Sequence, residues 1–365
     1  MIDELIAYGW NAERQAELAQ LEDDRLRIGR VAQATRNFCQ LLTAAGEVTV
    51  RVPGRFRHKH ASKTALPVVG DWVAFKPGSA TRDGSVERIL DRSTLLVRKA
   101  AGQRGSLQEQ AIAANVDLVF IVTGLDRDYN LRRIERYLAL VHHSGAEPVL
   151  VLNKLDLCDD PEQVLLEVQG LAAELPVHLV CARDPATREL LSGYLEPGRT
   201  IACIGSSGAG KSTLINQLLG FQRQATGAVS EVHAKGMHTT THRELIPLQG
   251  GAMLIDNPGM RELQPQADAD DLAAIFEEID QLAGGCRYHN CTHASEPDCA
   301  VKQAVASGTI DEERYQSFLK LQQEIAEREQ RLGLESTGNT KQRWKPLSKA
   351  LKKRKKDGWI SDEDD

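Results

Sequence analysis

The chain has 365 residues, 41% of them hydrophobic, and a formal net charge of −6 at pH 7. This length exceeds what one small core can organise, so about two or three domains are expected. The longest apolar runs, such as 118–122, are too short to cross a bilayer, and the start carries acids and no signal-peptide core. These features exclude a membrane protein and predict a cytoplasmic location.

Residues 1–40 are polar and alanine-rich, and we expect an N-terminal extension that is helical in part. From 41 to 105, β-rich runs such as EVTVRV, DWVAFK and TLLVRK alternate with Pro-Gly and Asp-Gly turns, which predicts a small OB-type barrel. A basic stretch runs from Arg51 to Lys63. Such barrels often bind single-stranded nucleic acid, so RNA binding is expected here, although a basic loop on a barrel is more often only solvated.

Residues 106–270 alternate buried strands with amphipathic helices. Runs such as DLVFIVTGL and EPVLVLNKL are almost continuously apolar. Parallel strands that are covered on both faces have this character, so a parallel sheet flanked by helices is predicted. From 271 to 335 the pattern becomes helical and includes a long charged helix near 311–332.

The segment 336–365 has an uneven charge. Nine Lys or Arg residues and no acid fall between Lys341 and Lys356, and the chain then closes on an acidic run. Like charges at this density repel one another and bury little apolar surface. We expect a disordered tail that either binds a polyanion or is simply solvated.

The segment GSSGAGKST matches the pattern G-x-x-x-x-G-K-[ST] between a predicted strand and a predicted helix. Its glycines let backbone N–H groups converge on phosphate oxygens at a helix N-terminus. Lys211 is expected to reach the β- and γ-phosphates, and the Ser212 hydroxyl to bind Mg²⁺. The predicted phosphate-binding residues are Gly205, Ser206, Ser207, Gly208, Ala209, Gly210, Lys211, Ser212 and Thr213.

The tetrapeptide NKLD, which ends at Asp156, predicts selection of guanine. The Asp156 carboxylate can accept hydrogen bonds from N1–H and the 2-amino group of guanine, whereas adenine has neither donor there. Asn153 and the stem of Lys154 are expected to brace the base and the phosphate loop. A backbone N–H of Cys181 or Ala182 is positioned to meet the guanine O6. GTP and GDP are therefore predicted as ligands in preference to ATP.

Two later segments complete the predicted nucleotide site. LIDNPG ends a buried strand at Asp256, whose carboxylate can hold Mg²⁺ through water, and the N–H of Gly259 can meet the γ-phosphate. HTTTH lies between the phosphate loop and Asp256, where a switch segment must supply a threonine to Mg²⁺. Thr240 is the first choice for that ligand and Thr241 the second.

NKLD precedes the phosphate loop, the reverse of the usual order in guanine-nucleotide switches. A circular permutation explains this order. The strand VHLVCA continues through a linker near 197–198 into TIACIG, which joins ends that are open in the ordinary fold. The cut then falls after the switch that follows DNPG, so this switch runs directly into the C-terminal region. Movement at the γ-phosphate is therefore expected to reach an output domain.

Cys286, Cys291, His293 and Cys299 follow the spacing C-x4-C-x-H-x5-C. Three thiolates and one imidazole suit one tetrahedral Zn²⁺ per chain, and four protein ligands leave no open position, so a structural site is predicted. A disulfide is disfavoured in a cytoplasmic chain. His289 is a rival to His293 as the fourth ligand.

The barrel, NKLD ahead of GSSGAGKST, HTTTH, DNPG and the cysteine-histidine finger together resemble the RsgA (YjeQ/EngC) family of circularly permuted GTPases over roughly 45–335. The resemblance implies a multidomain α/β protein with an N-terminal OB-type β-barrel, a circularly permuted P-loop GTPase domain and a C-terminal zinc-binding helical domain. It also implies GTP hydrolysis stimulated by the small 30S ribosomal subunit late in its assembly, contact with 16S ribosomal RNA, and release on hydrolysis.

The catalytic residues expected from these arguments are His238, Lys211 and Thr240. Met260 follows DNPG where many GTPases carry a Gln that orients the attacking water, and the resemblance implies His238 for that task. The predicted Mg²⁺ ligands are Ser212 and Thr240.

Two other functions fit the same motifs. One is a metal-handling GTPase that delivers zinc to a client protein, and a tightly held metal would argue against it. The other is an RNA-binding scaffold for which nucleotide is only a conformational ligand, and subunit-dependent phosphate release would argue against that. The sequence contains no obvious self-pairing element, so a monomer is expected.

Overall fold

The computed structural model describes residues 2–54, 66–79, 83–100, 108–126, 129–171, 174–221, 243–256, 272–273, 275–288, 291–294 and 296–331. The predicted site residues His238, Thr240, Thr241 and Gly259 lie outside the described residues, as do His289, most of the basic stretch that follows Arg51, and the tail. Within the described ranges, no helix is both long enough and apolar enough to cross a bilayer.

The N-terminal strands close into a barrel in the order β1-β2-β3-β5-β4. These strands are β1 (Arg27–Ala34), β2 (Phe38–Thr43), β3 (Gly46–Arg51), β4 (Trp72–Lys76) and β5 (Gly84–Ile89). Side chains such as Val31, Leu41 and Val73 fill the interior and are fully buried. The barrel begins at β1, earlier than the predicted boundary at residue 41. The strand was missed because Arg30 and Gln33 interrupt its apolar pattern.

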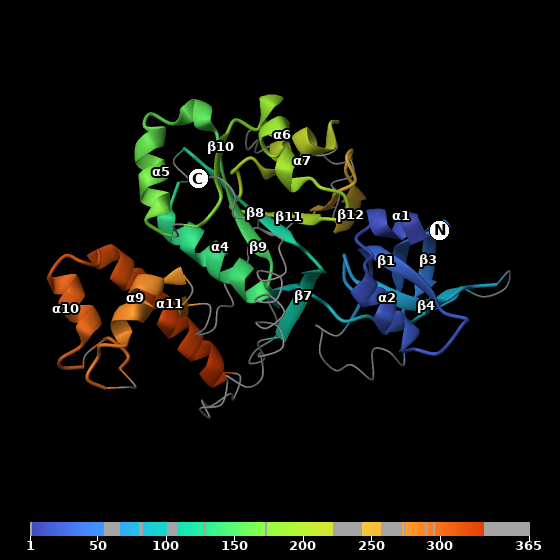
Figure 1. Cartoon of the computed structure of the whole chain (residues 1–365), viewed down its shortest axis with the longest axis horizontal. Helices are drawn as coiled ribbons and strands as arrows, with labels where there is room; N and C mark the ends of the chain where they lie inside the picture. Colours follow the sequence, from blue (N-terminus) through green and yellow to red (C-terminus); the bar gives the residue numbers. More distant parts are fainter. Residues whose placement is uncertain are drawn as a thin grey trace, which may run out of the picture.

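The run TLLVRK, which was expected in the barrel, forms part of a separate hairpin. It contributes β6 (Leu95–Ala100), which pairs antiparallel with β7 (Gln108–Ala114) in a two-stranded sheet. The apolar face of this hairpin, with Leu96 and Ile112, belongs to the core of the second sheet rather than to the barrel interior. The hairpin therefore lies between the two larger units, as Figure 1 shows for β7.

Two short helices precede the barrel, α1 (Ile2–Ala7) and α2 (Ala12–Ala19), in agreement with the expected helical extension. They pack on the barrel through a cluster that contains Leu5, Trp10 and Trp72. The rings of Trp10 and Trp72 meet edge to face with centroids 4.9 Å apart. The extension is thus an integral part of the barrel unit.

The second sheet has the strand order β10-β9-β8-β11-β13-β12. Its strands are β8 (Leu118–Gly124), β9 (Glu147–Asn153), β10 (Val177–Val180), β11 (Thr200–Ile204), β12 (Glu244–Pro247) and β13 (Met253–Asp256). All neighbouring strands pair in parallel except β12, an edge strand that runs antiparallel to β13. The parallel sheet was predicted, and the antiparallel edge strand was not.

Successive residues of each central strand enter two different cores, as the twofold repeat of a strand requires. Val119 and Ile121 of β8 pack under α4 (Leu131–Ser144) and α5 (Pro161–Gln169). Phe120 and Val122 share a core with α7 (Lys211–Leu219) and with Leu191, which follows α6 (Ala186–Leu190). Helices therefore cover both faces of the sheet (Figure 1).

The C-terminal helices are α9 (Glu277–Ala283), α10 (Ala300–Ala306) and α11 (Glu312–Arg331). Their apolar residues, including Phe276 and Phe318, continue the same core that α4 covers. Figure 1 shows α9 and α11 beside α4, on the side of the sheet remote from α7. The barrel, the mixed sheet with its helices, and this helical region together confirm the predicted fold class.

Candidate nucleotide site and metal cluster

Most of the predicted nucleotide residues within the described chain follow the carboxyl ends of four parallel strands. Asn153 ends β9, Cys181 follows β10, Gly205 follows β11 and Asp256 ends β13. Because the carboxyl ends of parallel strands meet at one edge of a sheet, these segments converge. The sequence could not reveal that β11 lies in the middle of the sheet, between β8 and β13.

Asn153 is the residue that ties these loops together. Its side chain is buried, and Nδ2 donates a hydrogen bond of 2.8 Å to the carbonyl oxygen of Ala209 in the phosphate loop. Its Oδ1 accepts a hydrogen bond of 2.8 Å from the backbone N–H of Ala182. Asn153 thus contacts the phosphate loop and also the loop after β10. Its predicted bracing of the base stays a prediction.

Two glycines of the phosphate loop make this close approach possible. A Cβ atom on Gly210 would lie 2.0 Å from Nδ2 of Asn153, and one on Gly205 would lie 2.1 Å from the carbonyl oxygen of Val122. Both residues also have positive φ angles, +95° and +144°. A larger residue at either position would meet both a close contact and an unfavourable backbone conformation.

Lys211 begins α7 directly after this loop. Its Nζ donates to the carbonyl oxygens of Gly205 at 2.8 Å and Ser206 at 2.5 Å, so the ammonium lies within the turn of the loop. Ser212 and Thr213 follow in the first helical turn and are half-buried. The ammonium is held by neutral carbonyl oxygens, and phosphate oxygens would bind it more strongly because they are charged acceptors. Nucleotide binding would therefore stabilise the ammonium of Lys211 further.

Asp256 is buried at the end of β13, beside the phosphate-loop strand. Burial raises the pKa of the Cys203 thiol to about 12, with a further contribution from the Asp256 charge and an opposing one from Lys211. A buried carboxylate next to a phosphate loop is suited to a hydrated divalent cation, so the site fits Mg²⁺.

The predicted base-reading residue Asp156 lies exposed in the 3-10 helix η2 (Leu155–Leu157).

Two residues that support the loops of this site were not predicted from the sequence. Thr187 donates from its hydroxyl to the carbonyl oxygen of Cys181 at 2.7 Å and so holds the loop after β10. Asp126 accepts a hydrogen bond of 2.5 Å from Nζ of Lys154. The triplet Gly-Leu-Asp at the end of a buried strand was the only signal for Asp126.

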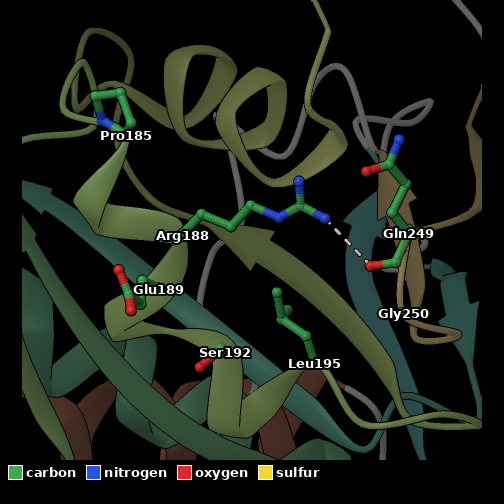
Figure 2. Close-up of a pocket in the computed structure, with 7 residues that line it drawn as sticks. All are labelled: Pro185, Arg188, Glu189, Ser192, Leu195, Gln249 and Gly250. Carbon is green, nitrogen blue, oxygen red and sulfur yellow. Dashed lines mark hydrogen bonds between the residues drawn. The ribbon is translucent and has the colours of Figure 1, made fainter.

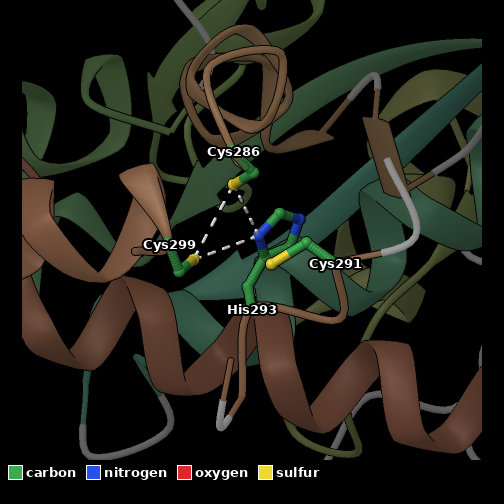
Figure 3. A group of neighbouring side chains, drawn as sticks. All are labelled: Cys286, Cys291, His293 and Cys299. Carbon is green, nitrogen blue, oxygen red and sulfur yellow. Dashed lines mark hydrogen bonds between the residues drawn. The ribbon is translucent and has the colours of Figure 1, made fainter. Parts of the chain in front are cut away.

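The second site is the cluster of Cys286, Cys291, His293 and Cys299, whose potential ligand atoms all lie within 4.8 Å of one another. Nδ1 of His293 is 3.5 Å from Sγ of both Cys286 and Cys299, and these two sulfur atoms are 3.8 Å apart. Figure 3 shows the four side chains pointing toward one another. The geometry therefore brings together the predicted Cys₃His set as a metal site.

The acid-base properties of the cluster also suit a metal. Burial acts to raise the pKa of the Cys286 thiol, but hydrogen bonds from the backbone amides of Val301 and Ala300 and with the thiols of Cys299 and Cys291 together lower that pKa. Burial, with the neighbouring thiols, raises the pKa of Cys291 to about 11. Burial lowers the pKa of His293, which favours the neutral imidazole. A bound cation would offset the repulsion among the thiolates.

A hollow of about 400 Å³ lies elsewhere on the same unit, between α6 and the turn after β12. Arg188 crosses it and donates to the carbonyl oxygen of Gln249 at 3.2 Å (Figure 2). Its lining contains none of the predicted site residues. It is formed by Pro185, Arg188, Glu189, Ser192, Leu195, Gln249 and Gly250.

Comparison with known protein families gives two matches along the chain that agree with the two N-terminal units. A family profile described as RsgA N-terminal domain matches residues 28–85, and one described as RsgA GTPase matches residues 89–266. A profile described as ABC transporter matches residues 189–355, a range that contains the phosphate loop.

Relatives match over nearly the whole chain. The small ribosomal subunit biogenesis GTPase RsgA of Opitutus terrae is 44% identical over 361 residues, which covers 96% of this chain and 98% of the relative. The protein of the same name from Syntrophotalea carbinolica is 44% identical over 326 residues and covers 87% of this chain and 88% of its own.

Solved structures agree in fold. The crystal structure of YjeQ from Thermotoga maritima superposes with a TM-score of 0.59 and 26% identity, and covers 82% of this chain and 99% of its own. That of YloQ, described as a circularly permuted GTPase, gives a TM-score of 0.58 at 23% identity over 84% of this chain and 97% of its own.

Proposed function

This chain belongs to the RsgA GTPase family, and we propose that it hydrolyses GTP as an assembly factor of the small ribosomal subunit. The observation that carries the proposal is the double contact of Asn153. By bonding to Ala209 and Ala182, it holds the phosphate loop and the loop after β10 in one fixed arrangement around NKLD. A guanine nucleotide is a ligand that needs both a phosphate cradle and a base reader.

The proposed roles of the site residues follow from this placement. The backbone of 205–213 and the ammonium of Lys211 bind the phosphates, and the carboxylate of Asp156 accepts from the base. The hydroxyl of Ser212 and the buried carboxylate of Asp256 are placed to hold Mg²⁺, which supplies charge stabilisation when bound. Thr240, with Thr241 as the second choice, is proposed as the switch ligand to Mg²⁺.

For hydrolysis we propose in-line attack of water on the γ-phosphate. Lys211 stabilises the charge that develops on the phosphoryl oxygens, and His238 orients the water. The N–H of Gly259 donates to the γ-phosphate. Intrinsic turnover is slow until the ribosomal partner orders the switch segment, so stimulation by the particle is part of the proposal.

Zinc is the metal we propose for the Cys₃His cluster, with one ion per chain. Three thiolates and one imidazole provide four ligands of the kind that Zn²⁺ prefers, and a closed set of four makes the ion structural. A tightly held metal would argue against the alternative in which the chain delivers zinc to a client protein. We further propose that the barrel contacts 16S ribosomal RNA and that the protein acts in the cytoplasm as a monomer, late in subunit assembly.

The deciding experiment measures phosphate release from GTP with and without purified 30S subunits, at one salt concentration, because contacts to RNA phosphates are salt-dependent. We expect strong stimulation by the particle. Asp156→Asn should shift preference from guanine to xanthine nucleotides, and His238→Ala should lose most of the stimulation while still binding GTP. A wild-type protein that binds GTP but hydrolyses none with subunits would instead support the scaffold function.

A further inference from the structure

We propose that Asp126 is a positioning residue of the nucleotide site, which acts by holding the side chain of Lys154. This inference rests on the proposed function, because it assigns a role within the same site. The carboxylate Oδ2 of Asp126 lies 2.5 Å from Nζ of Lys154. NKLD supplies Lys154, whereas Asp126 comes from the separate segment that follows β8, outside every predicted motif.

The register of the sheet creates this contact. β8 and β9 pair in parallel with Gly124 opposite Asn153, so the two strands end at the same level of the sheet. Directly afterwards, the backbone N–H of Leu125 donates to the carbonyl oxygen of Asn153 at 2.7 Å. The next residue is Asp126 in the segment after β8 and Lys154 in the segment after β9, and their charged groups are in contact.

Gly124 shows that the path of the lysine is closely fitted. A Cβ atom there would lie 2.8 Å from Oδ1 of Asp126 and 3.4 Å from both Cδ and Cε of Lys154. The aliphatic stem of Lys154 therefore passes over the backbone of Gly124, and the carboxylate of Asp126 contacts the ammonium at the end of that stem. Side chains that are held in this way keep one rotamer, which is what a stem that braces a base requires.

The backbone of Lys154 gives a second reason for a fixed partner. It has φ +65° and ψ +41°, a left-handed conformation that costs free energy for a residue with a Cβ. This conformation turns the chain into η2, where the N–H of Leu157 donates to the carbonyl oxygen of Lys154 at 2.9 Å. Asp156 lies inside that turn. The ion pair at Lys154 thus supports the turn that presents the base reader.

Water reaches the ion pair, which limits what it can add to overall stability. The two side chains are 25% and 29% exposed, and a hollow of about 400 Å³ borders Asp126 together with Tyr129 and Asp159. Partly exposed ion pairs stabilise folded proteins only slightly. The contribution of Asp126 should therefore appear in nucleotide binding rather than in the unfolding of the chain.

The test measures the affinities of GDP and of a non-hydrolysable GTP analogue by calorimetry on the full chain. Asp126→Asn keeps the shape of the side chain and removes its charge, and we expect both affinities to fall by the same factor, about two- to fivefold. The loss should appear in Kd and KM rather than in kcat, because Lys154 lies at the base end of the site. Asp159→Asn removes an exposed carboxylate from the same hollow and is the matched control.

A double-mutant cycle identifies the route of the effect. Lys154→Met keeps the stem and removes the ammonium, so Asp126→Asn should change the affinity no further in that background. Additive losses, or an Asp126→Asn protein that binds like the wild type, would overturn the inference. If the wild-type protein itself binds neither nucleotide, the proposed function fails first, so the two failures are distinguishable.

Discussion

Arg30 of the first barrel strand donates a hydrogen bond of 2.7 Å to the hydroxyl of Thr200, the first residue of the strand that leads into the phosphate loop. The guanidinium is buried and also donates to the carbonyl oxygens of Tyr8, Gly70 and Asn115. One side chain therefore joins the N-terminal extension, the barrel and the GTPase sheet. Every hydrogen-bond acceptor is neutral, and the buried charge is also favoured by the ring of Trp72, whose centroid is 5.6 Å from Cζ, and by the carboxylates of Asp117 and Asp71.

The first prediction concerns this junction. Thr200→Val should lower the free energy of unfolding by about 1–2 kcal/mol, because it takes one acceptor from a buried guanidinium. Arg30→Met strands several buried carbonyls at once and should cost about 3 kcal/mol or more. Urea unfolding followed by circular dichroism provides both values. Thr200→Ser keeps the hydroxyl and should stay near the wild type, and equal losses for Ser and Val would contradict the assigned bond.

A second prediction separates contact from backbone strain in the phosphate loop. Gly210 and Gly208 both have positive φ, +95° and +85°, but only Gly210 faces an atom of another residue, Asn153. Gly210→Ala must displace the Asn153 side chain and should cost about 2 kcal/mol more than Gly208→Ala, which bears the strain alone. Thermal unfolding without nucleotide measures the difference. Indistinguishable midpoints would mean that Asn153 does not clamp the loop.

The phosphate loop, NKLD and the Cys₃His spacing could be identified from residues a few positions apart, because each motif is short and its chemistry is local. The structure brings the Cys₃His side chains together, and the roles of the phosphate-loop and NKLD residues stay predictions. Arg30, Asp126 and Thr187 escaped prediction because their roles depend on which strands are neighbours. That neighbourhood is set by long-range pairing, which no local pattern records.

The barrel illustrates a different limit. Its first strand carries Arg30, a charged residue that points into a buried junction rather than to solvent. Alternation rules treat such a residue as evidence against a buried strand, so the predicted start of the barrel fell too late. TLLVRK was correctly predicted as a strand but was wrongly placed in the barrel. Its pairing partner, β7, could not be identified from the local sequence.

A third prediction concerns metal removal. Cys299 is buried in the cluster, and Cys299→Ser should abolish stoichiometric metal binding and lower the thermal midpoint, because the short segment between α9 and α10 has little core of its own. Prolonged chelation of the wild type should have the same effect. Elemental analysis together with calorimetry reports both quantities. Cys158→Ser, a half-buried cysteine outside the cluster, should retain the metal, and equal metal loss in both variants would refute the ligand assignment.

The last prediction concerns how the C-terminal helices are attached. Arg314 of α11 donates to Glu135 of α4 at 2.8 Å, and both are buried, with side chains 9% and 1% exposed. It also donates to Glu278 and to the carbonyl oxygens of Leu171 and Ile275. The next residue, Tyr315, donates from its hydroxyl to the carbonyl oxygen of the metal-cluster residue His293 at 2.5 Å. Adjacent residues of one helix thus contact the GTPase unit and the metal loop.

Breaking one side of this buried pair should be costly. Glu135→Gln or Arg314→Met removes a buried, charged hydrogen-bond partner, although Arg314 keeps Glu278 and Glu135 keeps Arg132. Each variant should lower the free energy of unfolding by about 2–3 kcal/mol, whereas the double variant should cost clearly less than the sum. The exposed pair Arg136–Glu324, with side chains 37% and 41% exposed, connects the same two helices and should contribute about 0.5 kcal/mol. Denaturant unfolding of both cycles tests this contrast. Equal coupling energies in the two pairs would show that burial of Arg314 does not fix the helical region to α4.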